Sequence, residues 1–369
     1  MSSELMLPVS IGEGLDKLTI LDIKCTKISD DRLASCKKEY NVLLESLQKY
    51  IDLYPWHYKI LREINLAIWD LQDGFHGKDI SEIEAGKICA QILEENDRRF
   101  RMKSKINHLC TSSLREVKGY AKKRCFFYGH LGLGDMFWLL GAVRYLATCY
   151  DEITVVCKKK YEANVRRLYD DDPTIKLYVV DDDANIQPFQ QVFAPQIESQ
   201  GIKVFACGQH SKKPVLYDFP LSFYDDLGIS RKSRSSYFYI PNTIDSEAIW
   251  QLVNSIAPKY IVVHQQSQNT TLPIWQHVAK STALLILDLN KNHYPKDHGF
   301  FGIADIVVGK PLFSYKKLLE EATEIHLLES SVYCMATHLD LSRVKVKLCY
   351  ESFDNSNERL GVFATGKLN

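Results

Sequence analysis

Apolar residues recur at three- and four-residue steps through the first third of the chain, which is the period of an amphipathic helix. Three stretches between about Leu15 and Tyr120 show it: Leu43, Leu44, Leu47 and Ile51; Trp56, Ile60, Ile64, Ile68 and Leu71; and Ile83, Ile88, Ile92 and Leu93. The turn signals YP at 54–55 and GFHG at 74–77 separate them. The pattern predicts an all-helical domain over residues 1–120.

From Arg124 onward, short apolar runs typical of strands alternate with helical segments. The predicted strands are 125–129, 153–158, 175–180 and 203–208, and then, after a polar interruption at 223–241, 260–265, 283–289, 304–310, 324–329 and 344–350. The predicted helices are 135–148, 161–169, 272–280, 314–322 and 330–338. Such alternation predicts parallel sheets, here in two Rossmann-like domains over 121–240 and 241–369. Ligands of such sheets lie beyond the carboxyl ends of the strands, so the cleft between the domains is the expected site.

Composition narrows the class of ligand. The 369 residues carry 46 basic and 46 acidic side chains, so no global field attracts nucleic acid or an anionic membrane. Ten singly scattered cysteines without a CxxC pair indicate reduced thiols and no structural zinc. The N-terminus lacks a signal-peptide pattern, and no run of about 18 apolar residues could span a bilayer. We therefore expect a cytoplasmic protein, with peripheral membrane contact left open.

Three glycines and an aspartate lie between a predicted strand and a predicted helix, at Gly129, Gly132, Gly134 and Asp135. Bare backbone N–H groups beside a helix start can meet an anion or a sugar hydroxyl. Alternatively, the glycines only make a tight turn and Asp135 only caps the helix. The spacing departs from G-x-G-x-x-G, and lysines at 158–160 replace the expected acidic residue, which disfavours NAD and leaves NADP as a weak alternative.

This glycine-rich element, with YEANVRRLYDDDPTIKLYVV at 161–180 and KPLFSYKKLLEEATEIHLLESSVYCMATHLDLS at 310–342, resembles the GT-B glycosyltransferases of the heptosyltransferase type. The resemblance implies an α/β fold of two facing Rossmann-like domains, here preceded by the helical domain. It also implies that the turn at Glu329, Ser330 and Ser331 receives the diphosphate of a nucleotide sugar. The family usually has Asp-Ser-Gly at this turn, and a proline where this chain has Leu140-Gly141. Some fucosyltransferase-like GT-B proteins also place a serine next to an acidic residue at this turn, so the resemblance is compatible with a GDP-linked as well as an ADP-linked donor.

Asp135 is the candidate general base, because sugar transfer with inversion needs a carboxylate near the acceptor hydroxyl. His130 is the second candidate for that role. The acidic runs at 170–172 and 181–183 read as solvated turns at helix or strand ends, so we expect no metal site. No cofactor is expected beyond the nucleotide-diphosphate sugar as donor substrate.

On the donor side, Ser330 and Ser331 offer hydroxyls to a diphosphate, although Ser330 could equally be only a helix cap. Lys310, at the end of the predicted strand 304–310, would add a cation at the sheet edge or lie solvated, with Ser314 capping the next helix. His264 and the polar loop after it, and the loop at 291–294, are candidates for contact with the donor. The predicted substrate-binding residues are Gly129, Gly132, Gly134, His264, Gln265, Lys310, Ser314, Glu329, Ser330 and Ser331.

Together with this resemblance, the sequence predicts a metal-independent glycosyltransferase of hexosyl, heptosyl or fucosyl type that acts on a glycan or glycolipid acceptor. The resemblance implies that the transfer is inverting. A non-catalytic nucleotide-sugar or glycan-binding scaffold and an NADP-dependent oxidoreductase are the alternatives. The helical domain carries no catalytic signature, and oligomerisation, acceptor recognition and docking onto a protein partner stay open for it. Its basic run, Arg98 to Lys105, reads either as a solvated helix face or as a phosphate- or partner-binding surface.

Overall fold

The computed structural model describes residues 7–75, 77, 79–208, 221–267, 270–290, 294–350 and 362–368. The chain divides into two compact units. The first unit consists of Met1–Arg124, Tyr145–Ile153 and Asp171–Thr174, and the second of Cys125–Arg144, Thr154–Asp170 and Ile175–Asn369. The three domain boundaries expected from the sequence stay a prediction.

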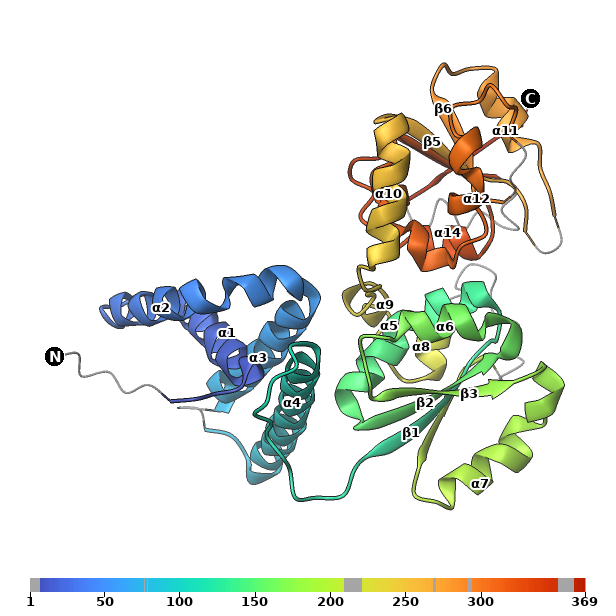
Figure 1. The fold of residues 1–369 in the computed structure, drawn as a ribbon. Coiled ribbons are helices and arrows are strands. Elements are labelled where there is room, and N and C mark those ends of the chain that lie inside the picture. The colour runs from blue at the N-terminus through green and yellow to red at the C-terminus, as the bar shows by residue number, and fades with distance from the viewer. Residues whose placement is uncertain are drawn as a thin grey trace. The chain divides into compact units, whose positions relative to one another are not determined.

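Four helices make up most of the first unit, as the apolar periodicity predicts (Figure 1). They are α1 (Ile11–Lys27), α2 (Arg32–Leu53), α3 (Pro55–Phe75) and α4 (Glu82–Leu109). Their core contains Leu15, Leu18, Ile60, Leu61, Ile64, Met102 and Ile106, each no more than 1% exposed. Ser10 and Ser81 cap α1 and α4 by accepting the backbone N–H groups of Glu13 and Glu84. The helical N-terminal region is therefore confirmed.

The basic run of α4 is neither a solvated face nor a free binding surface. Arg98, Arg101, Lys103 and Lys105 are no more than 8% exposed, and each is paired within the first unit. Arg98 forms an ion pair of 2.7 Å with Glu95, one helical turn earlier. Both interpretations from the sequence are therefore wrong for these four side chains, because burial against acidic partners replaces their contact with water.

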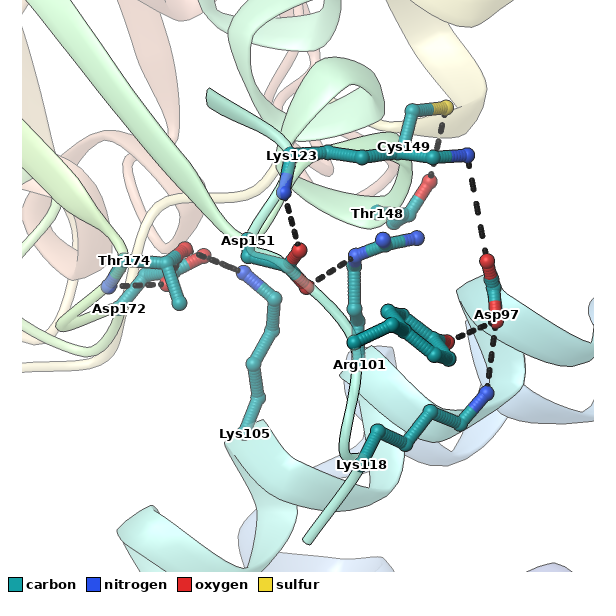
Figure 2. A network of polar contacts seen from close by, with 11 residues as sticks. Asp97, Arg101, Lys105, Lys118, Lys123, Thr148, Cys149, Asp151, Asp172 and Thr174 are labelled. Carbon is teal, nitrogen blue, oxygen red and sulfur yellow. Dashed lines mark hydrogen bonds and ion pairs between the residues drawn. The ribbon is translucent and has the colours of Figure 1, made fainter. Parts of the chain in front are cut away.

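Residues from the following α/β region supply several of these partners (Figure 2). Arg98 donates to the Thr148 hydroxyl at 3.0 Å, and Arg101 donates to Asp151 at 2.8 Å. Lys105 donates to Asp172, which lies in one of the turns that the sequence analysis interprets as solvated. Asp172 is only 3% exposed, so that interpretation is wrong here. Segments 145–153 and 171–174 thus fold as part of the helical unit.

Asp97, also on α4, anchors the segment that leads out of the helical region (Figure 2). Its carboxylate accepts hydrogen bonds from Lys118 at 2.7 Å and from the Tyr120 hydroxyl. Burial acts to raise the pKa of the Asp97 carboxyl. The two hydrogen bonds lower it and contribute to a pKa below the usual range. The irregular segment 110–123 is therefore held along α4 by charge-assisted hydrogen bonds.

The first sheet has four strands in the order β3-β2-β1-β4 (Figure 1). They are β1 (Arg124–Tyr128), β2 (Glu152–Lys158), β3 (Ile175–Val180) and β4 (Lys203–Ala206), and β1 pairs with β4 in parallel. The intervening helices are α5 (Leu133–Cys149), α6 (Glu162–Leu168) and α7 (Ala194–Glu198). This order belongs to half of a Rossmann fold, in which the strand order reverses beside β1.

The second sheet has five strands in the order β6-β5-β7-β8-β9, and every neighbouring pair is parallel. The strands are β5 (Tyr260–His264), β6 (Leu285–Asp288), β7 (Glu324–Leu328), β8 (Val346–Tyr350) and β9 (Ala364–Thr365). The helices are α10 (Ile244–Ile256), α11 (Ile274–Ala279), α13 (Lys316–Glu320) and α14 (Ser331–Ala336). Here the strand order reverses between β5 and β7, which makes their carboxyl ends the expected ligand site.

Two details of the second sheet differ from the sequence prediction. The stretch 304–310, predicted as a strand, begins with the short helix α12 (Ala304–Val307), whose end is closed by the Val308 N–H donating to the Ala304 carbonyl at 2.8 Å. The edge strand β9 is not predicted at all. The helices α8 (Ser222–Asp226) and α9 (Ser233–Ser236) occupy the polar interruption between the sheets. None of the helices in the described ranges is long and apolar enough to cross a bilayer.

Gly141 of α5 is expected to tolerate no side chain. A Cβ built there would lie 2.5 Å from the Ser233 carbonyl oxygen and 2.7 Å from that of Arg234, and such backbone atoms cannot move aside cheaply. We expect Gly141→Ala to lower the free energy of unfolding by about 1–3 kcal/mol, the usual cost of overpacking. Urea unfolding measures it.

Gly86 of α4 provides the matched control, since nothing lies within 4 Å of its Cβ position. Gly86→Ala should stabilise the protein by roughly 0.5–1 kcal/mol through helix propensity alone. Equal stability of the Gly141→Ala variant and the wild type would contradict the packing seen at α5.

Candidate functional site

A polar cavity of about 410 Å³ opens at the carboxyl ends of the strands of the first sheet. It is lined by Tyr128, Gly129, His130, Leu131, Gly132, Asp135, Lys158, Asp183, Gln187 and Gly208. These residues come from the ends of β1 and β2, the loops after β3 and β4, and the start of α5. The structure thus brings the predicted base Asp135, the alternative base His130 and two of the predicted glycines together in one cavity.

Asp135 lies in the first turn of α5 and is half-buried. Burial raises the pKa of its carboxyl, and the nearby His130, a hydrogen bond from the Gly132 backbone and the charge of Lys158 act against that rise. A carboxylate that is poorly solvated binds a proton more tightly than one in water. Asp135 is therefore suited to accept a proton from a substrate hydroxyl in this cavity.

Four polar side chains of the cavity wall are not among the site residues predicted from the sequence. Lys158, the last residue of β2, pairs with Asp183 at 2.6 Å, and Gln187 donates to the Tyr128 hydroxyl at 2.8 Å. Each follows or ends a strand, so the rule that parallel strands present their carboxyl ends at one edge could have found them. They supply both donors and acceptors at the edge where Asp135 lies.

His130 is held in the loop after β1. Its Nε2 lies 3.4 Å from the Gly208 carbonyl oxygen, and its ring centroid lies 4.9 Å from that of Phe223. A Cβ on Gly208 would come within 2.2 Å of the imidazole, and Gly208 also has a φ of +69°. Only glycine therefore fits opposite His130.

At each of the three positions where a glycine is predicted to face a ligand, a neighbouring atom of the protein leaves little room for a Cβ. A Cβ on Gly129 would lie 2.5 Å from Leu139 of α5, and one on Gly132 would lie 2.7 Å from the Asp135 carboxylate. A Cβ on Gly134 would lie 3.0 Å from Cys334 Sγ, on α14. Close packing thus accounts for the missing side chains, and contact of these glycines with a ligand stays a prediction.

The second sheet carries a separate polar cluster where its strand order reverses. His264 ends β5, and Ser330 follows β7 directly before α14. The Ser330 hydroxyl lies 3.2 Å from His264 Nδ1. Burial lowers the pKa of His264 to about 4, so the imidazole is neutral at pH 7. Two residues singled out from the sequence therefore meet, at the edge where ligands of such sheets bind.

Asn290, which no sequence motif indicates, completes this cluster. Its amide oxygen accepts the backbone N–H groups of Gln265 at 2.6 Å and Gln266 at 2.9 Å. Its amide nitrogen lies 3.1 Å from His264 Nε2. Both ring nitrogens of His264 thus have protein partners. Contact of His264 with a donor substrate stays a prediction.

The side-chain amide of Gln265 also forms hydrogen bonds within the protein. Its side-chain nitrogen donates to Asp288 at 2.6 Å, and its side-chain oxygen accepts the Trp275 N–H at 3.1 Å. Tyr294, from the loop after β6, likewise exchanges hydrogen bonds with the Asp288 backbone. Both ends of the Gln265 amide are therefore engaged within the fold. Asn269, Lys291 and His293, also candidates from the sequence, lie outside the described residues.

The remaining predicted residues are placed as follows. Lys310 is exposed and follows a short helix rather than a strand, so its expected position at a strand end is wrong. The Ser314 hydroxyl is buried and has no hydrogen-bond partner among the described residues, so its expected capping role is wrong as well. Glu329 and Ser331, on either side of Ser330, are half-buried. Contact of these four residues with a substrate stays a prediction.

Comparison with known proteins gives little more. No protein-family model and no curated protein matches the chain. Solved structures that align with it include the dodecameric iron-containing heptosyltransferase TibC in complex with ADP-D-beta-D-heptose, at 17% identity and a TM-score of 0.39, over 69% of this chain and 64% of that one. TibC from enterotoxigenic E. coli H10407 gives 17% identity and a TM-score of 0.40 over the same shares.

A glycosyl transferase of family 9 from Veillonella parvula DSM 2008 aligns at 12% identity and a TM-score of 0.38, over 64% of this chain and 83% of that one. For TibC, by contrast, the alignment spans less than two thirds of that protein's chain. Similarity at this level establishes neither a family nor an activity.

Proposed function

We propose that this protein is a glycosyltransferase that moves a sugar from a nucleotide-diphosphate donor to a hydroxyl of a glycan or glycolipid acceptor. The observation that carries the proposal is the poorly solvated carboxylate of Asp135 in a polar cavity at the carboxyl edge of a parallel sheet. The motif resemblance to GT-B glycosyltransferases, together with the second parallel sheet and its own polar cluster, supports the same class.

In the proposed reaction the acceptor occupies the cavity of the first sheet. Asp135 takes the proton of the acceptor hydroxyl while the hydroxyl oxygen forms a bond to the anomeric carbon of the donor sugar. The bond between that carbon and the diphosphate oxygen breaks, and its electron pair leaves with the nucleoside diphosphate. Attack from the face opposite the leaving group inverts the anomeric configuration. His130, next to Asp135, is the second candidate base.

The donor diphosphate is assigned to the hydroxyls of Ser330 and Ser331, and the proposed mechanism uses no metal. The start of α5 supports a shared site, because Gly134 packs against Cys334 and its Cβ position lies 3.7 Å from the Ser331 Cα. The GT-B arrangement of facing domains, and a hexosyl, heptosyl or fucosyl donor, belong to this proposal. Binding of a protein partner or a second copy is proposed for the helical region.

Thermal unfolding with nucleotide sugars tests the proposal. An ADP-, GDP- or UDP-sugar at a hundred times its dissociation constant should stabilise the protein by about 2.7 kcal/mol, and NADP should not. The stabilising sugar is then incubated with glycan and glycolipid acceptors while release of the nucleoside diphosphate is measured. Stabilisation by NADP alone would favour an oxidoreductase, and binding without release from any acceptor would favour a non-catalytic scaffold.

A further inference from the structure

We propose that His264 and Asn290 are positioning residues that fix the Ser330 hydroxyl as a hydrogen-bond donor toward an oxygen of the bound diphosphate. The identity of the ligand rests on the proposed function. The direction of the hydrogen bonds rests on the protein alone, and it follows from counting donors and acceptors.

The orientation of the Asn290 amide is fixed by the backbone of the β5 loop. One end of the amide lies within hydrogen-bond distance of two N–H donors, those of Gln265 and Gln266, so that end is the oxygen. The other end lies 2.8 Å from the Gln266 carbonyl oxygen and must donate to it. Exchanging oxygen and nitrogen would set donors against donors. The second hydrogen of the amide nitrogen is therefore left for His264 Nε2, at 3.1 Å.

This orientation determines which nitrogen of His264 carries the proton. Because Nε2 accepts from Asn290, the neutral ring carries its hydrogen on Nδ1. Nδ1 lies 3.2 Å from the Ser330 hydroxyl oxygen, so Ser330 accepts there. Burial, which keeps the ring neutral at pH 7, is consistent with this assignment.

Ser330 is left with a hydrogen to donate. Its hydroxyl makes no capping bond to α14, unlike the usual serine before a helix, and His264 is its one side-chain partner within the described part of the chain. A hydroxyl that already accepts from an N–H group keeps its own hydrogen for another acceptor, and Ser330 is only half-buried. Phosphate oxygens are acceptors without hydrogens, and a bond from O–H to an anionic oxygen is among the stronger hydrogen bonds.

Nuclear magnetic resonance of the nitrogen-15-labelled full chain tests the tautomer directly. We expect the His264 ring to show a protonated Nδ1 and an unprotonated Nε2, the opposite of the form that neutral imidazole prefers in water. A proton on Nε2 would overturn the inference. This measurement needs neither a variant nor a substrate.

Inorganic pyrophosphate, titrated by calorimetry, tests the consequence for binding. Ser330→Ala and His264→Leu should each weaken pyrophosphate binding about 10-fold, the cost of one hydrogen bond to a charged group. His264→Asn, whose amide can still donate from the place of Nδ1, should recover most of the affinity. In the Ser330→Ala background, His264→Leu should have no further effect, because His264 acts through Ser330.

His326 on β7 supplies the matched control for removing a buried histidine. It is 6% exposed, and its Nδ1 lies 2.9 Å from the Tyr350 hydroxyl. His326→Leu should leave pyrophosphate affinity unchanged. Additive losses in the His264 and Ser330 double variant, or no binding of pyrophosphate by the wild type, would overturn the inference. If these results hold while no acceptor is glycosylated, the proposed function fails and the inference stands.

Discussion

Asp135→Asn is expected to reduce sugar transfer about 10²- to 10⁴-fold, the usual contribution of a general base, and to leave nucleotide-sugar binding unchanged. The amide has the shape of the carboxyl and can still accept the Gly132 hydrogen bond that contributes to the pKa of Asp135. It cannot take up a proton. Initial rates of nucleoside diphosphate release, with binding followed separately by calorimetry, check both expectations.

Asp182→Asn is the matched control for this substitution. Asp182 is exposed, and its carboxylate accepts the Ala184 N–H at 3.3 Å, a capping contact that asparagine can also make. Turnover by the control variant should equal that of the wild type. If the Asp135→Asn enzyme also kept wild-type turnover, Asp135 would not be the base, and His130→Asn would be the next variant to measure.

Stability measurements separate lost chemistry from lost folding. Because burial raises the pKa of Asp135, the folded state binds this proton more tightly than the unfolded chain does. The ionised carboxylate therefore costs stability as pH rises above the ordinary carboxyl range, and the neutral amide avoids that cost. Asp135→Asn should be at least as stable as the wild type at pH 7, with the difference shrinking in acid. Urea unfolding at both pH values measures it.

The strands of the two sheets could largely be predicted from the sequence, because a parallel strand buried on both faces reads as a short apolar run between turn signals. The runs that became β1, β2, β5 and β7 are of this kind. The same rule failed at 304–310, where a short, partly apolar run forms the helix α12 (Ala304–Val307), of which only Ala304 and Val307 are buried. So short a run has no period that distinguishes the two.

The burial of the basic run of α4 could not be predicted from the sequence. The charge of a residue can be read from the sequence itself, whereas its burial depends on residues far away along the chain. The partners of Arg101 and Lys105 lie 50 and 67 residues further along the chain. A helix with five cations in eight positions is ordinarily solvated. Only the folded chain shows acidic turns packed on that face of α4.

The two candidate sites were predictable to different degrees. His130 and Asp135 are close in sequence, so a prediction that locates one at the end of β1 also locates the other there. His264 and Ser330 could be linked only through the rule that strand carboxyl ends share an edge. Asn290 carries no motif, since a lone asparagine after a strand is usual in turns. Its importance appears only in the hydrogen bonds that it makes to the β5 loop.

Asp172→Ala is expected to cause the largest loss of stability, about 3–5 kcal/mol in the free energy of unfolding, because it removes the carboxylate that pairs with the buried ammonium group of Lys105. Lys105 and Asp172 are each 3% exposed. Asp172 also accepts hydrogen bonds from the Thr174 backbone at 3.0 Å and from its hydroxyl at 2.6 Å. Chemical denaturation of the full chain, with the helical signal followed by circular dichroism, measures the loss.

An exposed ion pair of the same kind shows what burial contributes. Lys27 and Asp70 are 2.8 Å apart on the surface of the helical region, with side chains 41% and 55% exposed. Asp70→Ala should cost no more than about 1 kcal/mol, because water replaces the lost partner.

The double variant Lys105→Met with Asp172→Ala should recover much of the stability, since neither charge is then buried. A double variant no more stable than Asp172→Ala would show that Thr174, rather than the ion pair, makes Asp172 important. Recovery of stability in the double variant would show that the charge of Lys105 is tolerated in the interior because Asp172 pairs with it. The charge would then contribute to folding rather than to ligand binding.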